Sequence, residues 1–163
     1  MSERPGEMGC GAHVGWIAVN GTTALSRSLV ASHAVACDIV APFKIFELRS
    51  EVYGGQALRG LGGGAIGQVN ASGAPVHDVG GWAQLNVAPS PIWSVGAGFG
   101  MDDPRDSDLA ATARLRNAAG ALYVITHPSG PLLISAEVRR IATSYTGKKL
   151  FNDHFNLGFG FEF

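Results

Sequence analysis

The last thirteen residues of the chain, 151–163, alternate in character with a period of two. From residue 155 onward every odd position is apolar, and the even positions hold asparagine, glycine or glutamate. Because side chains at i and i+2 of a β-strand share a face, this pattern predicts a strand with one apolar and one polar face. The apolar face consists of Phe155, Leu157, Phe159, Phe161 and Phe163. Such a strand separates two media, which are water and a second sheet in a soluble sandwich, or a polar interior and lipid in a membrane barrel.

The composition limits the class of protein. The 163 residues suffice for one domain with its own core, and nothing in them marks a linker, so we predict a single domain over 1–163. With 15% charged residues and a net charge of −1, the chain offers no basic surface for nucleic acid. No apolar run approaches the roughly 18 residues of a membrane helix, so any membrane span would have to consist of strands. Residues 1–8 lack the features of a secretory signal, and we expect them to be disordered or the front end of a truncated chain.

Eight alternating segments follow one another, and no window shows the apolar stripe of a helix. They span residues 9–19, 29–41, 43–54, 79–88, 92–101, 114–127, 131–143 and 151–163. The connections are short and contain proline at 41–42, 89–91 and 127–131, whereas they are long and polar at 20–28, 54–78, 101–113 and 146–150. Short turns at one end and long loops at the other are typical of transmembrane barrels. We therefore predict an all-β, up-and-down antiparallel transmembrane β-barrel with about eight strands in this chain.

The phase of each segment predicts which side chains face the interior. The predicted lumen-lining residues are Glu47, Arg49, Glu51, Gln84, Asn86, Glu137, Arg139, His154, Asn156 and Glu162. Alternation alone does not assign the media, because a soluble barrel would have charge outside and apolar residues inside. The aromatic residues favour the membrane. Phe43, Trp93 and Phe163 fall near the short turns, and Tyr53 and Tyr145 fall near the long loops, as in two interfacial girdles.

The terminal segment Asn156-Leu-Gly-Phe-Gly-Phe-Glu-Phe163 resembles the C-terminal assembly strand of Gram-negative outer-membrane barrels, which typically ends in Phe after alternating apolar residues. Residues 80–87, 98–104 and 137–141 also resemble strands of larger porin-like proteins. The resemblance implies a bacterial outer-membrane location, contact with the lipid bilayer, and recognition of the five odd-numbered apolar residues by the barrel-assembly machinery. The chain departs from the family at its front, and the missing signal and short length suggest the C-terminal portion of a longer barrel, completed by further strands or by self-association.

Three functions stay open on these grounds. In a larger ring, the predicted lumen residues line a porin-like channel for small polar solutes. If the eight strands close alone, the same residues form a buried charge network that passes nothing, and the loops 54–78 and 101–113 would bind something outside. The third alternative is a soluble, lipocalin-like ligand carrier.

No motif for catalysis or for a cofactor stands out. Residues 62–67 fit the G-x-G-x-x-G phosphate fingerprint, but no helix pattern follows them, so we interpret them as an outer loop. The acidic run Asp102, Asp103, Asp106 and Asp108 lacks the glycine and the terminal glutamate of an EF-hand, which favours a solvated loop. The histidines at positions 13, 33, 77, 127 and 154 do not have the spacing of a zinc motif. We predict no enzyme activity, no catalytic residue, no metal and no cofactor.

The two cysteines, Cys10 and Cys37, fall opposite each other if the first hairpin turns near residue 24. They would then be neighbours on the lipid-facing side. Because a direct cross-strand disulfide is geometrically demanding, we expect two small apolar side chains rather than a bond.

Overall fold

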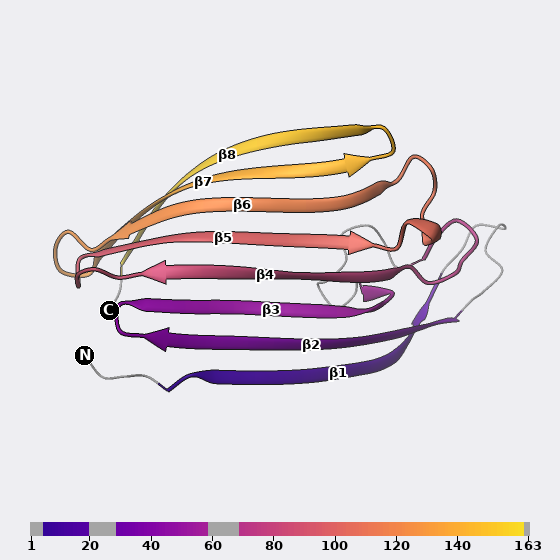
Figure 1. The fold of residues 1–163 in the computed structure, drawn as a ribbon, viewed down its shortest axis with the longest axis horizontal. Helices are drawn as coiled ribbons and strands as arrows, with labels where there is room; N and C mark the ends of the chain where they lie inside the picture. Colours follow the sequence, from indigo (N-terminus) through magenta and orange to yellow (C-terminus); the bar gives the residue numbers. More distant parts are fainter. Residues whose placement is uncertain (1–4, 20–28, 59–68, 162–163) are drawn as a thin grey trace.

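The computed structural model describes residues 5–19, 29–58 and 69–161. Eight strands form one antiparallel sheet in which each strand pairs with the next strand of the chain (Figure 1). The strands are β1 (Glu7–Ala18), β2 (Leu29–Phe43), β3 (Phe46–Gln56), β4 (His77–Val87), β5 (Trp93–Pro104), β6 (Arg114–Thr126), β7 (Leu132–Tyr145) and β8 (Lys148–Phe161). The prediction of an all-β, up-and-down chain with eight strands is confirmed. Within the described residues the sheet is open, with β1 and β8 as its two edges.

The connections sort by length less completely than we expected. The short turns after β2, β4 and β6 lie at one end of the sheet, together with the start of β1 and the end of β8 (Figure 1). At the opposite end, the expected long connection 146–150 is wrong, because β7 and β8 remain paired as far as Tyr145 and Lys148. The turn that remains contains Gly147 with a φ of +75°, a conformation that glycine adopts without steric cost.

The first short turn also differs from the expectation at 41–42. Strand β2 continues through Pro42, and the turn consists of Lys44 and Ile45. Pro42 lies beyond Val40, the last residue of β2 that pairs with β1. Proline is tolerated there because its missing N–H does not face a neighbouring strand on that side.

The register gives the sheet two faces. Direct partners on antiparallel strands share a face, so one face can be followed from partner to partner across the sheet. One such row consists of Pro42, Glu47, Asn86, Gly96, Tyr123, Glu137 and Asn156. We call the face that carries this row the inner face and the opposite face the outer face.

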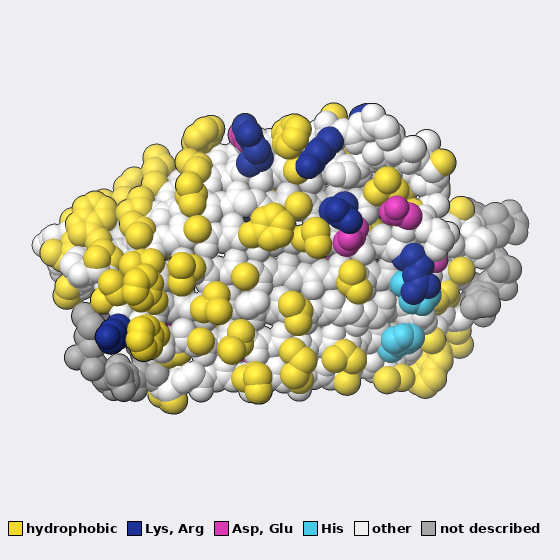
Figure 2. Space-filling model, viewed as in Figure 1, with side chains coloured by type: hydrophobic (Ala, Val, Ile, Leu, Met, Phe, Trp, Pro, Cys, Tyr) yellow, Lys and Arg dark blue, Asp and Glu magenta, His cyan; other side chains and the backbone are white. Residues whose placement is uncertain are grey.

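The outer face carries large exposed apolar side chains on every strand. On β8, Phe155 is 81% exposed and Phe161 is 70% exposed, and Leu157 and Phe159 lie between these values. The other strands contribute Met8, Val14, Trp16, Val35, Ile39, Leu48, Val52, Val79, Leu85, Val95, Phe99, Leu122 and Val138. Figure 2 shows hydrophobic side chains gathered over the end with the short turns, whereas the acidic side chains lie toward the upper edge and the opposite end.

The protein buries little apolar surface of its own. The buried hydrophobic residues in the described part of the chain are Val30, Ala57, Leu58 and Val76. They lie at the long-loop end, where the connection after β3 folds onto the inner face of β2. The Ser32 hydroxyl donates to the Ala57 carbonyl at 3.3 Å, and the Ala57 N–H donates to Val76 at 2.9 Å. This small cluster anchors one loop and is no core for a domain of this size.

Cys10 and Cys37 form a disulfide, so the expectation of two unlinked side chains is wrong. Their expected neighbourhood is confirmed, because they are direct partners in the register of β1 and β2 and lie on the outer face. The register of β1 and β2 places Cys10 directly opposite Cys37, with their Cα atoms 4.1 Å apart. The sequence alone does not fix this register, because it depends on where the hairpin turns.

Replacing both cysteines by alanine should destabilise the edge hairpin. The bond spans 27 residues of sequence, and the chain-entropy model assigns such a loop about 3.5 kcal/mol. We expect a lower midpoint of urea unfolding and faster amide exchange in β1 and β2, with little change in β5 to β8. Reductant should reproduce the effect in the native chain and leave the double variant unchanged. Equal unfolding midpoints for oxidised and reduced native chain would show that the bond is dispensable.

Candidate functional site

Two hydrogen-bonded groups of polar side chains cross the inner face, next to each other through the register pair of Tyr123 with Glu137, and we call them together the inner polar belt. It consists of Glu47, Arg49, Gln84, Asn86, Tyr123, Glu137, Arg139 and Asn156. All of these residues lie on strands whose opposite side is apolar. The belt is therefore positioned by strand phase alone, with no loop required.

The belt contains two copies of one arrangement, each on a hairpin. On β3 and β4, Arg49 Nε donates to Glu47 Oε1 at 2.6 Å, and Asn86 Nδ2 donates to the same oxygen at 3.2 Å. Asn86 is the direct partner of Glu47 in the register. A carboxylate that accepts from a guanidinium and an amide satisfies its charge within two adjacent strands.

The second copy lies on β7 and β8. Arg139 Nη2 lies 3.0 Å from Glu137 Oε1, and Asn156 Nδ2 donates to the same oxygen at 3.0 Å. Asn156 is again the direct partner of the glutamate. In both copies the arginine side chain is about twice as exposed as its glutamate, at 48% against 23% and 45% against 24%. The guanidinium groups thus present the more accessible charge of each pair.

Between the two copies, Gln84 and Tyr123 join β4 to β6 across β5. Gln84 Nε2 donates to the Tyr123 hydroxyl at 2.6 Å and to Asn86 Oδ1 at 2.8 Å. The Tyr123 ring covers Gly96 so closely that a Cβ there would overlap the ring. Glycine at position 96 is therefore what allows the belt to continue over β5.

The same device recurs nearer the long loops. The Tyr53 hydroxyl donates to Asp102 Oδ1 at 2.8 Å, and its ring covers Gly80 on the strand between them. Tyr53 and Tyr145 thus face the inner side by register, so the expectation that they belong to an outer aromatic girdle is wrong. Trp16 and Phe151 are the exposed aromatic residues of the outer face toward this end.

A hollow of about 880 Å³ lies on the inner side next to the short turns. Its polar wall is formed by Glu47, Arg49, Gln84, Asn86, Ser94 and Tyr123, and the turn 43–46 closes its end. The volume falls within the roughly 300–1,000 Å³ typical of small-molecule sites. The belt therefore borders a space that a small polar solute can occupy.

Two further carboxylates lie on the inner face, closer to the long loops than the belt. Asp38 and Glu51 are direct partners on β2 and β3, so their side chains share the inner face. Neither takes part in any of the ion pairs found within the described residues. Two carboxylates at this spacing give the inner face a local excess of negative charge.

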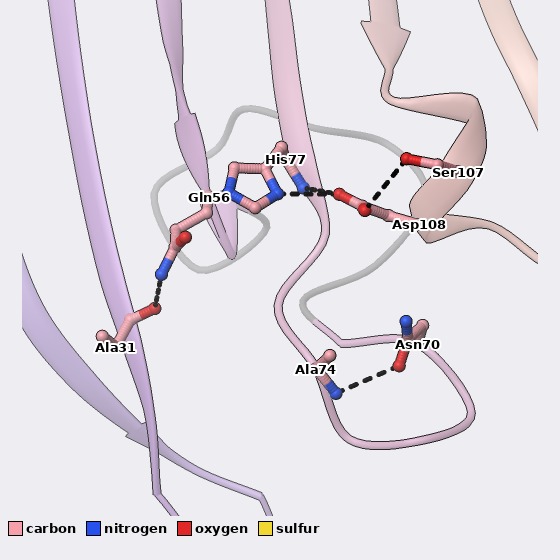
Figure 3. Close-up of polar contacts among 7 residues, drawn as sticks. All are labelled: Ala31, Gln56, Asn70, Ala74, His77, Ser107 and Asp108. Atoms are coloured by element: carbon pink, nitrogen blue, oxygen red, sulfur yellow. Dashed lines mark hydrogen bonds and ion pairs between the residues drawn. The ribbon is translucent and has the colours of Figure 1, made fainter.

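Polar contacts at the long-loop end join the connection after β5 to the start of β4, join β3 to β2, and close a turn within the connection after β3 (Figure 3). Asp108 Oδ2 accepts from the His77 backbone N–H at 2.9 Å and lies 2.7 Å from His77 Nδ1. These contacts, the backbone N–H first, hold the pKa of the Asp108 carboxyl below its ordinary value. Gln56 donates to the Ala31 carbonyl at 2.9 Å, and the Ala74 N–H donates to Asn70 Oδ1 at 3.0 Å.

The acidic run does not lie wholly in a loop and does not converge on one point, because Asp102 and Asp103 belong to β5 and Asp106 and Asp108 follow in the connection to β6. Asp102 accepts from Tyr53 on the inner face, whereas Asp103 pairs with Arg116 on the outer face at 2.7 Å. Asp108 lies in the 3-10 turn η2 (Asp106–Asp108) and contacts His77 at the start of β4. Among the described residues, no group of three or more His, Cys, Asp or Glu is arranged to hold a metal ion.

The structure places nine of the ten predicted lumen-lining residues on the inner face. These are Glu47, Arg49, Glu51, Gln84, Asn86, Glu137, Arg139, His154 and Asn156, and Glu162 lies outside the described residues. Glu51 and His154 share the face without joining the belt, and His154 Nε2 is buried with no hydrogen-bond partner within the described chain. Phe155, Leu157, Phe159 and Phe161 of the proposed assembly strand lie on the outer face, and Phe163 is outside the described residues, as is the glycine motif 62–67.

Comparison of the sequence and the structure with protein-family models, curated proteins and solved structures finds no match. No helix in the described ranges is long and apolar enough to cross a membrane.

Gly96→Ala should disrupt the belt, whereas Gly98→Ala should not. A Cβ at 96 would overlap the Tyr123 ring, but a Cβ at 98 would meet its nearest atom at 3.6 Å, an ordinary contact. Both glycines lie on the inner face of β5. Overpacking of this kind costs about 1–3 kcal/mol, which urea unfolding would measure. Comparable stability of the two variants would mean that Tyr123 has room to move.

Asp108→Asn should loosen the fifth connection and remove a pH dependence. Because folding lowers the pKa of this carboxyl, its stabilising effect is present above the unfolded value of about 3.9 and is lost as the pH falls through the folded value. The protection of the His77 amide, the slowing of its exchange relative to that of an unstructured peptide at the same pH, should therefore fall below about pH 4 in the native chain. In the variant the protection should be low and independent of pH in this range. Asp106→Asn, in the same turn, is the matched control and should behave as the native chain does.

Proposed function

We propose that this sheet is the wall of a bacterial outer-membrane pore for small polar solutes, in a barrel with more strands than the eight described here. The observation that carries the proposal is the contrast between the two faces. Every strand presents apolar side chains outward, and a polar belt runs across the inner face from β3 to β8. Lipid outside and water inside are the media that suit such a wall.

The height of the outer apolar band supports a membrane span. On β5 the band runs from Trp93 to Met101, nine residues, and ends at the pair of Asp103 with Arg116. On β8 the described part of the band runs from Phe161 to Phe155, the pair of Asp153 with Arg140 follows, and the exposed Phe151 lies beyond that pair. A transmembrane strand needs about 9–11 residues. The charged pairs therefore stand where an interface with water would lie.

The open edges favour a wider ring over a closed barrel of eight strands. Strands β1 and β8 are long and apolar on one side, and such edges require a partner. Closing these eight strands on each other would fill the interior with side chains and bury the charges of the belt, at a high desolvation cost. In a wider ring, further strands or a second copy join both edges, and Glu47, Arg49, Glu137 and Arg139 stay in water.

The other two alternatives find less support. A soluble lipocalin-like carrier needs a polar exterior and an apolar interior, and the exposed phenylalanines of β8 have the opposite arrangement. A non-conducting barrel needs an interior filled by side chains, and the hollow beside the belt argues against that. The disulfide of Cys10 with Cys37 fits a compartment outside the cytosol, where such bonds persist.

The inner charges favour cations over anions. Arg49 and Arg139 each pair with a glutamate on their own strand, so neither leaves an excess of positive charge. Asp38 and Glu51 add negative charge on the same face, beyond the belt. Rings of carboxylates bias a wide pore toward cations.

The protein, inserted into planar bilayers, should give discrete conductance steps with a preference for potassium over chloride. Glu51→Gln should shift the reversal potential toward the anion side, because it removes one inner carboxylate without breaking a pair. Asp103→Asn removes a carboxylate of the outer face and is the matched control, for which we expect no shift.

Two results would contradict the proposal in different ways. If the protein floats with vesicles but gives no conductance steps, the proposed membrane location stands and the proposed pore is wrong. If the folded chain is stable and monodisperse in the absence of detergent, the proposed membrane location is wrong.

A further inference from the structure

A groove of about 550 Å³ crosses the outer face of β5 to β8. Two outward rows of the register border it. One row is Ala97, Leu122, Val138 and Phe155, and the other contains Gly120, Arg140 and Asp153. The remaining lining residues, among them Gly98 and Ala121, belong to the inner row between these two. A hollow that touches two outward rows and the backbone between them lies on the outer face.

Small residues create the groove. Ala97 and Gly120 leave its floor low, and a Cβ added to Gly120 would meet no atom within 4 Å. Leu122, Val138 and Phe155 form its apolar side and are themselves 60%, 46% and 81% exposed. Its shape and lining suit a flexible hydrocarbon chain.

A cationic and aromatic cluster begins at Arg140 and Asp153, which line the groove, and continues beyond it to Phe151 and Lys149. Arg140 pairs with Asp153 through two hydrogen bonds of 2.7 Å. The Arg140 guanidinium and Lys149 Nζ lie 5.8 Å and 5.5 Å from the centre of the Phe151 ring. Two cations and one carboxylate leave this cluster with a net positive charge. The other outer pair, Asp103 with Arg116, contributes no residue to the groove.

We propose that this groove is a binding site for one anionic phospholipid, with an acyl chain along Gly120 and Leu122 and the phosphate beside Lys149 and Arg140. The inference rests on the proposed function, since it needs the outer face to meet a bilayer. Charge complementarity selects an anionic headgroup over a zwitterionic one. An apolar groove that ends at Arg140, with Lys149 beyond it on the far side of Phe151, suits a charged lipid.

The test uses the whole chain with its disulfide intact, in nanodiscs that contain phosphatidylglycerol and phosphatidylcholine in equal amounts. Native mass spectrometry then identifies the lipids that stay bound to the protein after it is released from the nanodiscs. The native chain should retain phosphatidylglycerol in preference to phosphatidylcholine. Lys149→Gln should weaken this preference about fivefold, the effect of one basic residue beside an anionic headgroup. Lys148→Gln is the matched control, because it removes the same charge from the neighbouring residue on the inner face.

Gly120→Val tests the acyl chain separately from the headgroup. A Cβ at this position would meet no atom within 4 Å, so the fold should persist while the larger side chain displaces the bound lipid. Retention of phosphatidylglycerol by this variant, or equal retention of both lipids by the native chain, would overturn the inference. Vesicle flotation of the same samples separates the two proposals. A chain that floats without lipid preference overturns only the lipid site, and a chain that does not float overturns the membrane location.

Discussion

The unbroken antiparallel register from β1 to β8 is the constraint on which the other features of this protein depend. Because the side-chain period of a strand is two, a slip of one residue at any pairing would move a strand's apolar set to the inner face and its polar set to the outer face. Glu47 meets Asn86, and Glu137 meets Asn156, only in the observed register. The belt, the outer band and the disulfide are three consequences of that one alignment.

This register stabilises the sheet without a conventional core. Apart from the small cluster around Val30 and Leu58, the described residues bury almost no hydrophobic side chain. Backbone hydrogen bonds hold the strands together, but the large apolar surface of the outer face is left to the surroundings. The free energy that burial supplies to a soluble domain must therefore come from whatever covers Phe155, Phe159 and their outward neighbours. Fold and environment are in this sense inseparable.

Much of the sheet was predictable because alternation is a local signal. The eight segments and the shared face of Glu47, Gln84 and Glu137 follow from residue type and phase alone. What was missed depends on pairs of strands. Tyr123 belongs to the belt because glycine lies at position 96 on the next strand, and the cysteines are bonded because the hairpin aligns them. The turn after Tyr145 was misjudged because polar residues such as Lys148 and Lys149 fit a strand end as well as a loop.

The repeated arrangement of glutamate, arginine and asparagine means that the charges of the inner face are paired locally, whatever lies beyond the two edges of the sheet. Each copy is complete within one hairpin, since the arginine lies two residues after the glutamate and the asparagine lies opposite it. In each copy the glutamate and the arginine pair with each other on one strand, so the pairing does not require a distant strand. A hairpin with this property can be placed next to any other pair of strands without leaving an unsatisfied carboxylate. The polar chemistry of the inner face is thus set by pairs of adjacent strands and does not depend on how many strands the proposed barrel contains.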